Sequence, residues 1–198
     1  TGAIGDMGCH TLAHIARALK LGHPTSVHAS STKLLPETAP SASMVHYDFP
    51  ARQDMPAVKL TWYDGGLKPR RPEGLDDSRQ LGEEGLIFIG EQAAMLCGFT
   101  GENPMLIPEK RMKQYERPPK TLPRSIGHYE EWIEACKGGK PAGCNFDVGG
   151  PLTEIVLLGN IAIRTGEKLN WDGENMKITN VPEANDYLHY EYREGWTL

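Results

Sequence analysis

Residues 57–63 read AVKLTWY, in which Val58, Leu60 and Trp62 occupy every second position. A period of two places alternate side chains on opposite faces of a β-strand. One face of this strand is therefore expected to pack on a core. The other face is expected to carry more polar residues.

Further runs with strand character lie on both sides of this stretch. They are residues 26–32, 43–49, 85–89 and 93–99, the last two joined by Gly90-Glu91-Gln92 as a hairpin. Strand follows strand without an intervening helix, which favours an antiparallel sheet. The connection 64–82 is rich in Gly, Pro and charge, and its length predicts a functional lid, a partner contact or disorder.

Apolar residues at helical spacing predict a helix over residues 8–21, closed by Gly22 and Pro24. A second helix is expected to bury an aromatic stripe that includes Tyr129 and Trp132. The strongest helical pattern covers residues 151–165, with Pro151 in its first turn. It should be largely buried.

A short strand at 177–179 and an aromatic tail at 187–196 complete the chain, and the tail is expected to pack on this domain or on another. The predicted fold class is α+β. It consists of a large, mainly antiparallel open-faced sheet with helices packed on one face.

Composition excludes several classes of partner. The chain has 198 residues, 39% of them hydrophobic, and a net charge of -5, so it has no positive field to hold nucleic acid. No apolar run approaches the roughly 20 residues of a membrane span, and we expect no membrane partner. The four cysteines lack paired C-x-x-C spacing and are expected to be ordinary buried thiols.

The segment Gly5-Asp6-Met7-Gly8-Cys9-His10 carries the chemistry of greatest interest. If a helix begins near Met7, the Asp6 carboxylate and the His10 imidazole project from one end of it. An imidazole accepts a hydroxyl proton at neutral pH, and a nearby carboxylate can orient it. The alternative is that Asp6 caps the helix and His10 is an ordinary core or surface histidine.

This segment resembles the D-x-G-x-H signature that opens the second domain of the Gfo/Idh/MocA oxidoreductases, the glucose-fructose oxidoreductase and inositol dehydrogenase family. The likeness covers nearly the whole chain. It includes a Trp62-Tyr63-Asp64-Gly65-Gly66 turn, a Phe88-Ile89-Gly90-Glu91 hairpin, and residues 145–160, which resemble a bacterial subgroup with sugar-type substrates.

The resemblance implies that His10 is a catalytic acid/base and Asp6 its polar partner near a nicotinamide. It implies an NAD or NADP cofactor, and a sugar, cyclitol or related polyol as substrate. The sequence holds no G-x-G-x-x-G loop, so the whole of residues 1–198 is expected to be a C-terminal substrate-binding and catalytic domain. The nucleotide would bind an N-terminal Rossmann domain outside this chain, and the chain alone should be inactive.

Family members commonly pair through the open sheet face, so a homodimer or homotetramer is expected. The compartment, cytoplasmic or periplasmic, is left open. One position departs from the family pattern: Ala13 stands where a second aspartate is common, and His14 follows it.

Three further residues are candidates for substrate binding: His14, Trp62 and His128. Trp62 could stack on a sugar ring, although its alternation with Val58 and Leu60 favours a core position. His10 and His14 have the i, i+4 spacing of zinc ligands, but a third ligand is not evident and no metal site is predicted. Two other functions stay open: a redox-assisted glycosidase of the same family, and a non-enzymatic sugar-binding or assembly module.

Overall fold

A computed structural model describes residues 1–196 of the protein. The chain divides into two compact units. The first consists of Thr1–Pro69 together with the chain from Glu154 onwards, and the second consists of Arg70–Thr153.

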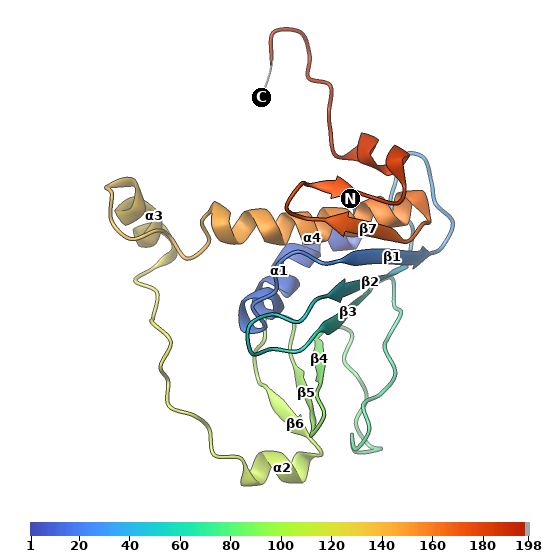
Figure 1. Cartoon of the computed structure of the whole chain (residues 1–198). Helices are drawn as coiled ribbons and strands as arrows, with labels where there is room; N and C mark the ends of the chain where they lie inside the picture. Colours follow the sequence, from blue (N-terminus) through green and yellow to red (C-terminus); the bar gives the residue numbers. More distant parts are fainter. Residues whose placement is uncertain (197–198) are drawn as a thin grey trace. The chain divides into compact units, whose positions relative to one another are not determined.

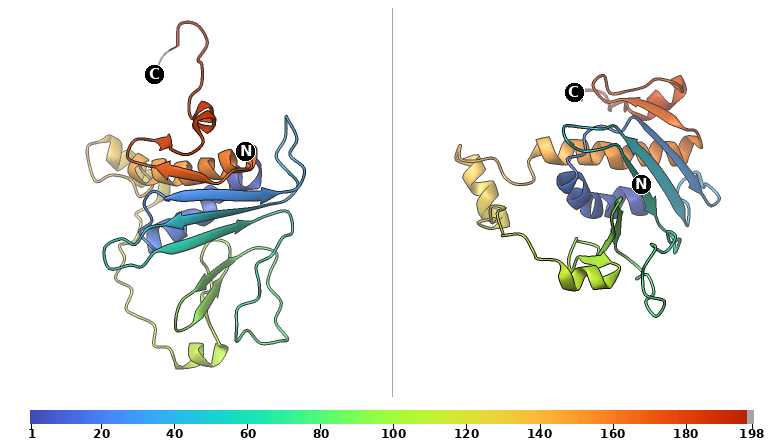
Figure 2. Two further views of the ribbon diagram at one scale, coloured as in Figure 1. Left: turned by 45° about the vertical axis from the view of Figure 1, so that its right-hand side comes forward. Right: turned by 60° about the horizontal axis from the view of Figure 1, so that its bottom comes forward.

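A five-stranded sheet forms the centre of the first unit. Its order is β3-β2-β1-β7-β8, and every neighbouring pair is antiparallel. The strands are β1 (Ser26–Ser31), β2 (Ser43–Phe49), β3 (Val58–Tyr63), β7 (Leu169–Asp172) and β8 (Lys177–Ile178). Helix α1 (Gly2–Ala18) and the second half of α4 (Phe146–Thr165) lie on one side of it (Figures 1 and 2). The predicted α+β fold with an open antiparallel sheet is confirmed.

Strand β2 shows how the sheet separates core from surface. Its burial alternates without exception: Val45, Tyr47 and Phe49 are buried toward the helices, whereas Met44, His46 and Asp48 on the other face are half-buried. Leu60 of β3 pairs with Tyr47 and continues the helix-side face. Burial raises the pKa of the Tyr47 phenol far above its ordinary value.

Helix α1 begins six residues earlier than the sequence pattern predicted, at Gly2, and ends three residues earlier, at Ala18. Its buried stripe is Ile4, Gly8, Thr11 and Leu12, half of which is not apolar. Gly8 lies against α4, where an added Cβ would meet Val156 Cγ2 at 3.1 Å. Beyond the helix, Lys20 adopts a left-handed conformation with φ 48°.

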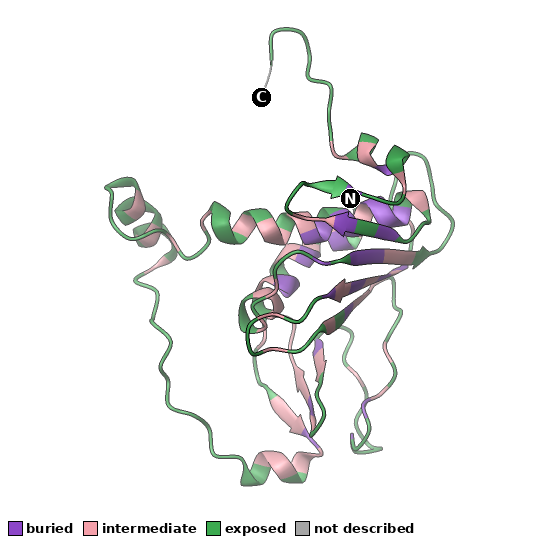
Figure 3. Ribbon diagram, in the orientation of Figure 1, coloured by how far each residue is buried: buried purple, intermediate pink, exposed green. Residues whose placement is uncertain are grey.

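Helix α4 also begins earlier than predicted, at Phe146, so Pro151 lies inside it and not in its first turn. The Asp147 amide donates to Asn145 Oδ1 at 2.9 Å, which satisfies a free amide at the helix start. All its buried residues lie from Ile155 onwards (Figure 3): Ile155, Val156, Leu158, Gly159, Ile161, Ala162 and Ile163.

By length and composition alone, α4 would be long and apolar enough to cross a membrane, which corrects the expectation that no segment approaches that length. Of the apolar window, 39% is buried inside the structure. A core helix of a soluble protein passes the same test, so one such helix is weak evidence for a membrane span.

The second unit has a sheet of its own, in the order β4-β5-β6. The predicted hairpin is confirmed as β4 (Leu86–Ile89) and β5 (Ala94–Cys97), and β6 (Met105–Ile107) was not predicted. Its small core is Leu75, Ala94 and Ile107. The unit also contains α2 (Glu109–Gln114) and α3 (His128–Cys136).

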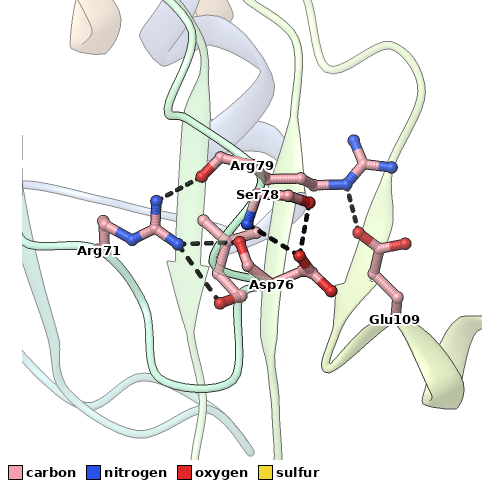
Figure 4. A network of polar contacts seen from close by, with 6 residues as sticks. Arg71, Asp76, Ser78, Arg79 and Glu109 are labelled. Atoms are coloured by element: carbon pink, nitrogen blue, oxygen red, sulfur yellow. Dashed lines mark hydrogen bonds and ion pairs between the residues drawn. The ribbon is translucent and has the colours of Figure 1, made fainter.

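Arg71 organises the part of the long 64–82 connection that belongs to the second unit (Figure 4). Its guanidinium donates to the carbonyl oxygens of Asp76, at 2.9 Å, and of Arg79. Ser78 donates through both its amide and its hydroxyl to Asp76 Oδ1, which lowers the pKa of that carboxyl. Arg79 forms an ion pair with Glu109. The connection is thus tied together by its own side chains.

Two expectations about burial were wrong for the described residues, those for the aromatic stripe of α3 and for the cysteines, and the tail aromatics are not buried against this domain. Helix α3 has no buried residue, and Tyr129 is 73% exposed, because nothing within its own unit covers the aromatic stripe. The tail aromatics are also exposed and contact one another, as Tyr190 and Tyr192 do with ring centroids 5.7 Å apart. Packing of the tail on another domain stays a prediction. The four thiols are free, and all are half-buried or exposed.

Candidate functional site

Three polar side chains lie along one face of α1. Asp6, His10 and His14 follow one another at intervals of four residues, which places them about 6 Å apart along the helix axis on the same side. All three are exposed, whereas Ile4 and Leu12 on the opposite side are buried. The prediction that Asp6 and His10 project toward the same space therefore agrees with the helix geometry.

The position of Asp6 differs from the expected one. Because α1 begins at Gly2, Asp6 lies in the second turn and cannot cap the helix. Within residues 1–196, neither Asp6 nor His10 has a hydrogen-bond or ion-pair partner, so the carboxylate does not orient the imidazole by direct contact. Both groups are available to a ligand.

Trp62 lies on the helix side of β3 and pairs with Val45 in the sheet. It is half-buried, and its indole nitrogen donates to Asp64 Oδ2 at 2.8 Å. Asp64 also accepts from the Ser43 amide at 2.6 Å and the Ser43 hydroxyl at 2.7 Å. The polar edge of Trp62 therefore anchors the turn that follows β3.

His128 is the first residue of α3 and is exposed. Its ring meets Tyr129 edge to face, with centroids 5.2 Å apart. It belongs to the second unit, whereas Asp6, His10, His14 and Trp62 all belong to the first. Among the residues that the structure describes, no group of three or more His, Cys, Asp or Glu side chains could hold a metal ion.

The open sheet face carries a histidine pair that the sequence reasoning missed. His28 of β1 and His46 of β2 are register partners, and their rings stack with centroids 4.7 Å apart. His46 Nδ1 lies 3.1 Å from Thr61 Oγ1 on β3. Burial, and then the neighbouring His28, lower the pKa of His46, while Asp48 acts in the opposite direction. The sequence did offer a signal for this pair, because both histidines occupy outward-facing positions on two neighbouring predicted strands.

A cavity of about 30 Å³ lies near the start of α1, between Ile4, Asp64 and Arg164. This is room for a water-sized group only. Neither Asp6 nor His10 lines it. The candidate site is thus an exposed helix face and not an enclosed pocket of the first unit.

Comparison with solved structures shows a shared fold. An NAD-binding protein from Listeria innocua matches with a TM-score of 0.54 at 9% identity, covering 85% of this chain and 47% of that one. An oxidoreductase from Agrobacterium radiobacter, solved with NAD+, L-tartaric acid and magnesium, matches with a TM-score of 0.39 at 14% identity. That match covers 83% of this chain and 48% of the oxidoreductase.

At 9% identity, the Listeria protein shows that the two chains share a fold and nothing more. The TM-score of 0.39 for the Agrobacterium protein is too low to support a conclusion. The chain spans about half the length of both structures. No protein-family model and no curated protein matches the sequence.

Proposed function

We propose that this chain is the substrate-binding and catalytic part of an NAD(P)-dependent oxidoreductase. Its substrate would be a secondary alcohol of a sugar, cyclitol or related polyol. The observation that carries the proposal is the position of Asp6 and His10 about one helical turn apart on an exposed face of α1, where neither side chain has a partner among the described residues. The fold shared with an NAD-binding protein supports it.

The proposed acid/base chemistry belongs to His10. In the oxidation direction its neutral imidazole takes the hydroxyl proton as the O–H bond breaks, and in the reduction direction it returns that proton. Asp6, about 6 Å away along the helix axis, would bind a neighbouring hydroxyl group and stabilise the imidazolium that forms. A bound nicotinamide would accept or supply the hydride at the carbon.

The residues of this chain fit the substrate side of that reaction and not the nucleotide side. They include no glycine-rich phosphate loop at the start of a helix, which is the usual pyrophosphate site. Nucleotide binding is therefore assigned, within this proposal, to a Rossmann domain outside these residues.

The isolated chain should accordingly bind NAD+ poorly, because it lacks a phosphate loop and its net charge of -5 disfavours a pyrophosphate. Calorimetric titration of the 198-residue chain with NAD+ should give no saturable heat in the micromolar range. The same titration of the complete oxidoreductase is the positive control. Micromolar binding by the chain alone would contradict this division of roles.

The proposal extends to assembly through the open sheet face, with a second copy of the chain as the partner. Asp48 and Lys59 are register neighbours on that face. Asp48 Oδ2 already accepts from Ser26 Oγ at 2.9 Å and lies 3.8 Å from Lys168 Nζ, so a self-complementary, two-fold contact would bring the exposed Lys59 of each copy to the Asp48 carboxylate of the other. The half-buried His28, His46 and Thr61 lie beside them on the same face.

Acid should separate such a dimer. Burial already favours the neutral form of His46, so its protonation as pH falls through its lowered pKa would place an unpaired charge in the contact. The neighbouring His28 also lowers the pKa of His46, and Asp48 partly offsets both effects. Light scattering should report a dimer near neutral pH and dissociation in acid, and His46→Gln should reduce that sensitivity. A monomer at all concentrations and at neutral pH would refute the pairing.

A further inference from the structure

We propose a second ligand site at the other end of α1, in a surface pocket of about 520 Å³, that binds a neutral polyhydroxylated molecule through His23. Its principal lining residues are Lys20, His23, Arg52, Trp171, Asp172 and Glu174. This volume is within the range of small-molecule sites, roughly 300–1,000 Å³. All of the lining belongs to the first unit.

The carboxylate of Glu154, which is mostly shielded from solvent, holds the histidine at this pocket. His23 Nδ1 lies 2.7 Å from Glu154 Oε1, and the same oxygen accepts the indole N–H of Trp171 at 2.7 Å. The Glu154 side chain is only 9% exposed, whereas that of His23 is 44% exposed. A desolvated carboxylate with two hydrogen bonds thus fixes a histidine that faces solvent.

This contact determines the chemistry that His23 offers. A carboxylate accepts hydrogen bonds, so the imidazole donates through Nδ1 and, when neutral, presents the lone pair of Nε2 to a ligand. Gly173 makes room for the ring, because a Cβ there would lie 2.1 Å from His23 Cγ. The ring is therefore held from two sides, by Glu154 and by the backbone of the turn after β7.

The charges around the pocket favour a neutral ligand. The charges nearly balance, since Lys20 and Arg52 are positive, whereas Asp172, Glu174 and the Glu154 carboxylate behind His23 are negative. Arg52 is already occupied, since its Nε donates to the Leu19 carbonyl oxygen at 2.7 Å. Hydroxyl groups both donate and accept hydrogen bonds, so a polyol can satisfy His23 Nε2, the carboxylates and the Lys20 ammonium together.

Asp172 keeps its charge and its place in this lining. Its Oδ2 accepts from Asn175 Nδ2 at 2.8 Å, and the hydrogen bonds from Asn175 lower the pKa of the carboxyl. The carboxylate is therefore a fixed acceptor for ligand hydroxyls at neutral pH.

The pocket is separate from the proposed catalytic face. Its first lining residue, Lys20, lies ten residues beyond His10, and the helical part of that interval alone extends about 12 Å. The proposal therefore does not depend on Asp6 or His10 being catalytic, and it can hold or fail independently.

The test follows the indole N–H resonance of Trp171 by NMR in the 198-residue chain. The titrants are myo-inositol, the cation D-glucosamine and the anion D-gluconate. We expect saturable shifts with myo-inositol, and weaker binding of both ions. His23→Ala should weaken myo-inositol binding by about tenfold or more.

Two variants separate a ligand site from a structural contact. Glu154→Gln keeps an acceptor for Trp171 but replaces the charge-assisted hydrogen bond that holds His23, so binding should weaken less than in His23→Ala while the melting temperature changes little. His189→Ala removes an exposed histidine outside the pocket and should leave binding unchanged. The proposal is overturned if myo-inositol does not saturate, if either ion binds more tightly, or if His23→Ala binds as wild type.

Discussion

If the proposed function is correct, replacing His10 by alanine in the full-length protein should lower kcat by about 10²- to 10⁴-fold, the usual contribution of a general base. The folded state should be unaffected, because His10 is exposed and has no partner within residues 1–196. The measurement is NAD(P) reduction with the proposed class of substrate, a sugar or cyclitol on which the wild-type protein gives turnover. Melting temperatures of both proteins show whether the loss is chemical.

His189→Ala is the matched control, since it removes an exposed histidine that lies far along the chain from α1. It should leave kcat unchanged. Asp6→Asn retains the size of the side chain and removes its charge, so it should reduce kcat less than His10→Ala does. Unchanged NAD(P) reduction by His10→Ala would favour the non-enzymatic sugar-binding module. Product analysis separates net oxidation from redox-assisted cleavage of a glycosidic bond.

The sheet could be predicted because its signal is local. The alternation of Val58, Leu60 and Trp62 appears in the sequence within a few residues, and in the structure these residues pair with the buried Phe49, Tyr47 and Val45 of β2 on the helix side. The start of α1 could not be predicted in the same way. Its buried stripe contains Gly8 and Thr11, which a search for apolar spacing does not count.

In the candidate site, too, the arrangement of residues close in the sequence could be predicted, whereas contacts between distant residues could not. A spacing of four residues was enough to place Asp6 and His10 on one helix face. The contact between His23 and Glu154 joins residues 131 positions apart, and no sequence pattern predicts it. For α3, the spacing of Tyr129 and Trp132 identified an apolar face correctly, but spacing says nothing about what covers such a face.

Gly159→Ala should destabilise the protein by about 1–3 kcal/mol, the usual cost of overpacking a core. An added Cβ would lie 2.2 Å from the Tyr47 hydroxyl oxygen and 2.9 Å from Ile4 Cδ1. Both neighbours are only 1% exposed, so neither can move aside into solvent. Tyr47 is on β2 and Ile4 on α1, which makes Gly159 a point of close contact of α4 with both the sheet and the other helix.

The matched control is Gly149→Ala in the same helix, where no atom lies within 4 Å of the added Cβ. There the substitution should stabilise the protein by about 0.5–1 kcal/mol, because alanine loses less backbone entropy than glycine when a helix forms. Urea denaturation followed by circular dichroism measures both changes. The same change from glycine to alanine should therefore lower the free energy of unfolding at residue 159 and raise it at residue 149. Equal stabilisation by both variants would mean that α4 is not seated on β2 at Gly159, and the core described above would be incorrect.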